Sequence, residues 1–150
     1  MPALSQTLTF KITNGSTTTN STQVSYPNTA TGALFFNSEK IQGNGYFGGG
    51  DGLHTVAWQV SDFVGAITIQ GTLASDPQNA DWAVVTLDAT NNLHTIDTTG
   101  LIRPSNTTST VYTTATGAIK SYNFVGNYVW VRARISNMTQ GVVYSISINR

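Results

Sequence analysis

Apolar and polar residues alternate along most of this chain, which is the period of strands that bury one face. Residues 7–13 (TLTFKIT) place Phe10 and Ile12 on one face, with threonines and a lysine on the other, so both residues are predicted to lie in a core. The same alternation recurs at 54–61, 66–73, 82–87, 94–98, 109–115, 128–135 and 142–148. The pattern predicts an all-β protein.

Two of these segments predict further core positions. In 66–73 (AITIQGTL) the face expected to be buried carries Ile67, Ile69 and Leu73. The face expected to point outward carries Thr68, Gln70 and Thr72. In 128–135 (YVWVRARI), Val129 and Val131 begin the buried face. The opposite face of that segment is then the Trp–Arg face, made of Tyr128, Trp130, Arg132 and Arg134.

Turn-forming residues separate the strands, and the turn at 137–141 is expected to join the last two strands as a hairpin. About eight to ten short strands at this spacing predict an antiparallel β-sandwich, jelly-roll-like, with an immunoglobulin-like sandwich as the alternative. The length fits a single domain over residues 1–150. Within it, residues 15–31 are rich in Thr, Ser and Asn and form either an ordered edge or a mobile arm.

The chain carries few charges: 9% of its residues are charged, whereas soluble domains average about 25%. Seven basic and seven acidic side chains give a net charge of zero, which argues against nucleic acid as a partner. There is no cysteine, so disulfides and thiolate chemistry are excluded. The first residues lack the pattern of a secretory signal, and no apolar run is long enough to span a membrane. We therefore expect a soluble protein with no membrane partner.

Candidate chemistry is sparse, and the sequence predicts no catalytic residue, no metal site and no cofactor. His54 and His94 each stand alone in a strand pattern, whereas a zinc site needs three or four ligands. The glycine-rich stretch 48–56 (GGGDGLHTV) resembles one copy of a calcium-binding nonapeptide, but that motif works only as stacked repeats. Asp76 and Asp81 could flank a glycosidic bond, although Asp76 also opens an ordinary turn.

Three interpretations of the Trp–Arg face remain open. It is a solvated sheet face on which the Trp130 ring and the arginine side chains cover one another. Alternatively it is a contact surface, because Trp, Tyr and Arg dominate the energetics of protein interfaces. A third interpretation is a platform on which a sugar ring stacks.

Two stretches of the chain resemble small β-rich virion structural proteins of contractile-tailed marine phages of the cyanophage type. The stretches are 54–85 (HTVAWQVSDFVGAITIQGTLASDPQNADWAVV) and 122–149 (YNFVGNYVWVRARISNMTQGVVYSISIN). The resemblance implies no active site. It implies a structural role for the corresponding positions, which are Phe63, Gly65, Gln70, Trp82, Phe124, Gly126, Trp130 and Arg132.

The resemblance and the composition together predict a non-enzymatic phage virion structural protein, either an exterior capsid (decoration) component or a tail component. Such a protein assembles in the host cytoplasm, through its β-sheet faces, with other virion proteins and copies of itself. The alternative is a carbohydrate-binding jelly-roll module for host-surface adhesion, in which a surface glycan stacks on Trp58, Trp82 or Trp130. A glycan-cleaving enzyme using Asp76 and Asp81 is the third hypothesis.

Overall fold

Two long strands form the centre of the protein. The computed structural model describes residues 5–14, 16–25, 35–48, 50–85, 94–96, 102–104, 109–110 and 118–150. Strands β7 (Leu53–Thr72) and β13 (Trp130–Asn149) each run for 20 residues and pair antiparallel, from Trp130 opposite Thr72 to Asn149 opposite Thr55. The other strands are β1 (Ser5–Thr7), β2 (Phe10–Asn14), β3 (Thr17–Ser21), β4 (Val24–Ser25), β5 (Phe35–Asn37), β6 (Ile41–Gln42), β8 (Ala83–Val84), β9 (His94–Ile96), β10 (Ile102–Pro104), β11 (Ser109–Thr110) and β12 (Ala118–Val125). Two short 3-10 helices complete the set, η1 (Asn44–Phe47) and η2 (Asn79–Asp81).

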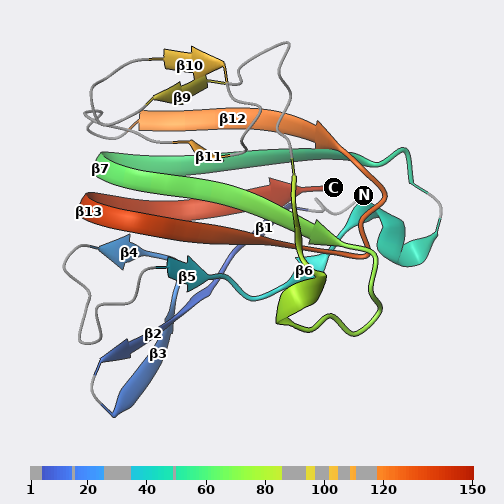
Figure 1. Ribbon diagram of the computed structural model, residues 1–150, viewed down its shortest axis with the longest axis horizontal. Coiled ribbons are helices and arrows are strands. Elements are labelled where there is room, and N and C mark those ends of the chain that lie inside the picture. The colour runs from blue at the N-terminus through green and yellow to red at the C-terminus, as the bar shows by residue number, and fades with distance from the viewer. Residues whose placement is uncertain are drawn as a thin grey trace.

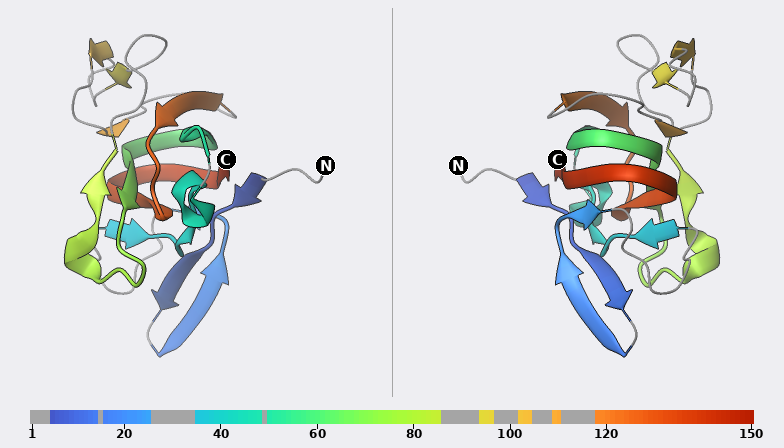
Figure 2. Two further views of the ribbon diagram at one scale, coloured as in Figure 1. Left: turned by 90° about the vertical axis from the view of Figure 1, so that its right-hand side faces the viewer. Right: turned by 90° about the vertical axis from the view of Figure 1, so that its left-hand side faces the viewer.

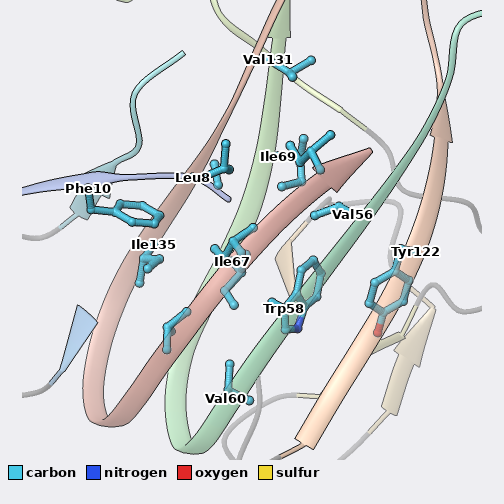
Figure 3. Close-up of a cluster of buried hydrophobic side chains, with 14 of the residues drawn as sticks. Leu8, Phe10, Val56, Trp58, Val60, Ile67, Ile69, Tyr122, Val131 and Ile135 are labelled. Carbon is cyan, nitrogen blue, oxygen red and sulfur yellow. The ribbon is translucent and has the colours of Figure 1, made fainter. Parts of the chain in front are cut away.

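The ribbon made by β7 and β13 folds back on itself, so that its two halves face one another (Figure 1, Figure 3). Register shifts between Ser136 and Ser145 mark the bend, and Gly141 adopts a positive φ of 84° within it. Such irregularities let a strand turn a corner without leaving its partner. The predicted antiparallel β-sandwich is confirmed, and one ribbon supplies the centre of both layers.

The shorter strands extend each half of the ribbon. In one layer, β12 pairs with the first half of β7, while β1 and β4 pair with the second half of β13. In the other layer, β8 and β11 pair with the second half of β7, while β5 and β6 pair with the first half of β13. All of these pairings are antiparallel. Each layer brings together segments from distant parts of the chain.

The prediction of a hairpin at 137–141 is wrong. These residues lie inside β13, and both halves of that strand pair with β7 rather than with each other. Likewise 54–61 and 66–73, apart from Leu73, belong to one strand, β7, and not to two. The turn-forming residues are absorbed as bulges in the bend, where they curve the strand instead of ending it.

The core lies between the two halves of the ribbon (Figure 3). Phe10, Ile67, Ile69 and Val131 have no exposed surface, as expected from the alternation. Ile12 is half-buried and packs against this cluster. Two expectations fail because the residues stand outside the paired strands. Val129 is half-buried just before β13, and Leu73 is 73% exposed just after β7.

Within the segment 15–31, the structure describes residues 16–25. Strand β3 pairs with β2 to form a hairpin, here called the arm (Phe10–Ser21), which extends away from the sandwich in both views of Figure 2. The next residues contribute β4, which pairs with β13. Gly15 and residues 26–31 lie outside the described residues. The arm is connected to the sandwich at Phe10, which is fully buried. The alternatives for 15–31, an ordered edge or a mobile arm, stay predictions.

Candidate functional site

Arg132, at the centre of the predicted Trp–Arg face, is an interior residue with 7% of its surface exposed. Its Nε donates a hydrogen bond of 2.8 Å to Oε1 of Gln70, and its guanidinium lies 4.2 Å from the centre of the Trp82 ring. Burial, and then the nearby charge of Arg134, lower the pKa of Arg132, yet a guanidinium stays protonated in proteins. Little of this side chain can therefore meet a partner.

The expectation that the polar residues of 66–73 point to solvent is wrong. Thr68, Gln70 and Thr72 are only 7%, 5% and 4% exposed. They share a face with Arg132, and the chain that follows β7 places the Trp82 ring against the Arg132 guanidinium before it pairs alongside β7 as β8. The second half of β7 is thus covered on both sides, which alternation along one strand cannot reveal.

Trp130 and Arg134 are half-buried, and both have partners within the chain. The indole N–H of Trp130 donates to the carbonyl oxygen of Ser75 over 3.0 Å, and Lys40 Nζ lies 4.5 Å from the ring centre. Arg134 donates from Nε to Oδ1 of Asn37 over 2.8 Å. A partner role for these two residues stays a prediction.

Tyr128 does not lie on the outer face with the other three, which corrects the sequence-based placement. It precedes β13 and packs against the hydrophobic core. Its ring lies so close to the backbone that a side chain at Gly71 or Gly126 would collide with it. The predicted Trp–Arg face therefore does not form one surface: Tyr128 is half-buried against the core, Arg132 is buried, and Trp130 and Arg134 are half-buried.

The sequence alone does not show the role of His54, which is fully buried. Nε2 accepts the backbone N–H of Asn44 over 3.0 Å, while Nδ1 lies 2.8 Å from the carbonyl oxygen of Gly52. These two bonds require a neutral ring that carries its proton on Nδ1. Burial lowers the pKa of His54, and the ring stacks on Phe124 with 4.5 Å between centres. His54 therefore holds η1 against the start of β7.

An open groove of about 530 Å³ lies beside η1. Its lining comes from three parts of the chain and consists of Gly43, Asn44, Phe47, Gly50, Asp51, Leu53, Thr55, Asn149 and Arg150. The ring of Phe47 is 74% exposed. It meets Tyr46 edge-on at 4.9 Å between ring centres, and Tyr46 in turn meets Trp130 at 5.0 Å. An exposed row of aromatic rings therefore leads from the Trp–Arg face into the groove.

One signal in the sequence could have pointed to this groove. Tyr46 and Phe47 are adjacent aromatic residues inside a glycine-rich stretch, GNGYFGGGDG, where no strand could bury them. By contrast, Trp58 is only 1% exposed, so it offers no ring face to a sugar. Trp82 is half-buried beneath the Arg132 guanidinium. Of the three tryptophans proposed as platforms, Trp130 alone borders the aromatic row.

The remaining candidate residues have structural partners. Asp76 lies 3.9 Å from Lys40 Nζ, and Asp81 Oδ2 accepts the backbone N–H of Gln78 at the start of η2. In the part of the chain that the structure describes, no three acidic or histidine side chains gather as metal ligands would. Over the same residues, no helix has the length and hydrophobicity that crossing a membrane requires. His94 lies in β9, and its side chain is outside the described residues.

Comparison with known proteins assigns the chain to no family. No family model matches the chain, and neither a curated protein nor a solved structure matches it. Four of the eight positions that carry the resemblance to virion proteins are interior in this fold. Phe63, Gln70, Phe124 and Arg132 are at most 7% exposed.

Proposed function

We propose that this protein is a non-enzymatic structural subunit of a phage particle, an exterior capsid or tail component. It assembles in the host cytoplasm with other virion proteins and with copies of itself. Assembly uses β-sheet surfaces, and the arm makes the first contact with a neighbouring subunit. The resemblance of 54–85 and 122–149 to small virion proteins supports this class of function.

The observation that carries the proposal is that the arm projects from the sandwich with one of its strands paired on one side only within the described residues. Strands β2 and β3 pair with each other, and among the described strands β3 has no second neighbour. Figure 2 shows the arm reaching beyond the sandwich. Its base is fixed, because Phe10 is fully buried and Glu39 N donates to Thr9 O over 2.8 Å. A two-stranded hairpin is at best marginally stable in water, so a surface that covers the arm would stabilise it.

The chemistry of the arm favours strand pairing with a neighbour. Soluble proteins usually protect an exposed edge strand with lysine, proline or a bulge. Strand β3 (TTTNS) contains neither charge nor proline, and its register with β2 is continuous. Exposed threonine and asparagine side chains can hydrogen-bond across a wet interface without the cost of burying charge. An unprotected edge of this kind is suited to adding a strand from another subunit.

The test is the abundance of the chain in purified phage particles, measured by quantitative mass spectrometry. The double variant Thr17→Lys with Thr19→Lys places two charges on the edge of β3 and is expected to reduce the number of copies per particle. Asn79→Lys with Ala80→Lys adds the same charge at exposed positions of η2 and serves as the matched control. Absence of the wild-type chain from particles would refute the proposal. Equal incorporation of both variants would refute the role of the arm.

A further inference from the structure

The groove beside η1 has the features of a preformed ligand site. Its volume of about 530 Å³ falls within the range of roughly 300–1,000 Å³ that is typical of sites for small molecules. Three separate segments build it, namely η1, the start of β7 and the end of β13. Figure 2 shows η1 beside the C-terminal end of the chain. The groove is distinct from the arm on which the proposed function rests.

Phe47 supplies the apolar side of the groove. Its ring is 74% exposed, although Tyr46 holds one edge of it. An exposed phenylalanine that a neighbouring ring contacts offers an aromatic face at little further cost in side-chain entropy. Leu53, which is 46% exposed, adds a second apolar contact in the same groove.

Asp51 and Arg150 supply polar groups around that ring. Oδ1 of Asp51 accepts the backbone N–H of Leu53 over 3.0 Å, and Oδ2 makes no hydrogen bond within the described residues. The guanidinium of Arg150 lies 5.8 Å from the Phe47 ring centre. Its Nη1 donates to Gln42 O over 2.7 Å, while Nη2 has no partner in the described part of the chain. One oriented acceptor and one oriented donor therefore flank the aromatic face.

The loop that carries these groups is held in one shape. Gly52 has a φ of 79°, which favours glycine, and its carbonyl oxygen is bonded to His54. At Gly50 a side chain would collide with the amide of Asn44. The Asn44 side chain in turn donates to Asp51 Oδ1 over 3.2 Å and to Leu53 O over 3.3 Å. Because these groups are already ordered, ligand binding costs little conformational entropy and therefore little affinity.

The ligand class follows from this set of groups. A pyranose presents an apolar C–H face, which stacks on an aromatic ring, and a rim of hydroxyls, each of which can donate and accept. Among the described residues that line the groove, only Phe47 and Leu53 have apolar side chains, so a lipid chain would find few apolar partners there. An anion such as phosphate would meet the carboxylate of Asp51 as well as the single cation Arg150. We propose that the groove binds a neutral saccharide, with Phe47 as the stacking platform and Asp51 and Arg150 as hydroxyl partners.

The experiment is a titration of the full chain, followed by backbone-amide NMR. The probes are glucose, galactose, mannose and N-acetylglucosamine, each as the monosaccharide and as a β-linked disaccharide. We expect saturable shifts at Asn44, Asp51 and Thr55 with at least one probe. Phe47→Ala should weaken that binding about tenfold. Asp51→Asn keeps an oxygen for the Leu53 N–H but removes the charge, and it should also weaken binding.

Val125→Ala is the matched control, because Val125 is 70% exposed and lies outside the groove. It should bind as the wild type does. If no probe shifts the groove amides, or if Phe47→Ala binds as tightly as the wild type, the inference is wrong. Phe47→Ala should still enter phage particles normally, so failure of this inference is distinguishable from failure of the proposed function.

Discussion

The backbone N–H of Asn44 donates a hydrogen bond to Nε2 of His54, although the two residues are ten positions apart. The bond joins η1 to the start of β7. The imidazole is fully buried and stacks on the ring of Phe124. Protonation of Nε2 would place two N–H groups against each other in an interior site. The local structure beside the groove therefore depends on a neutral histidine.

This dependence predicts a loss of stability in acid. The pKa of His54 in the folded protein lies below 6.5, first because the ring is buried; Asp51 opposes the shift and Arg150 adds to it. The unfolded chain then binds the proton more readily, so the contribution of this residue is complete above pH 6.5 and declines as the pH falls below it. Thermal unfolding between pH 4 and 8, on the wild type and His54→Gln, measures the effect. Parallel pH profiles for the two proteins would contradict the prediction.

The buried contact of Arg132 predicts a stability effect that its charge alone would not suggest. Arg132→Ala removes both the hydrogen bond to Gln70 and the cover over Trp82, and it leaves Gln70 Oε1 buried without that donor. We expect a loss of about 2 kcal/mol in the free energy of unfolding. Urea denaturation measures it, with Lys11→Ala at an exposed position as the control. Equal values for the two variants would show that the contact contributes nothing.

The two-layer core predicts that two similar truncations lower the free energy of unfolding by unequal amounts. Ile67→Ala removes methyl groups from a fully buried site and should cost about 2–5 kcal/mol. Val129→Ala affects a half-buried residue that precedes β13 and should cost about 1 kcal/mol. Chemical denaturation of both variants gives the comparison. A cost at Val129 as large as that at Ile67 would mean that Val129 belongs to the core, as its alternation with Val131 suggested.

The sequence predicts which face of a strand is buried better than it predicts how the strands are connected. Alternation placed Val131 correctly in the core, because a side chain two positions along a strand returns to the same face. It could not show that 137–141 bends within one strand, since a bulge and a hairpin loop use similar residues. Nor could it show that Gln70 is covered on its polar side, because that cover comes from a segment whose packing is a tertiary effect.

Dependence on tertiary packing also explains why the candidate sites could not be predicted in full from the sequence. The residues of the Trp–Arg face follow one another along a single segment and can be read from the sequence, but their partners Gln70, Ser75 and Asn37 lie on other strands or loops. The groove joins η1 to Arg150, which are more than 100 residues apart, so no local pattern could reveal it. Within one segment, only the exposed aromatic pair in its glycine-rich loop was available as a signal.

A cryo-EM reconstruction of purified particles of the phage that we propose encodes this chain tests the central proposal most directly. The account predicts density for this sandwich on the exterior of the head or on the tail, with β3 of the arm against a neighbouring subunit. A particle that lacks the chain, or one in which β3 faces solvent in every copy, would contradict it.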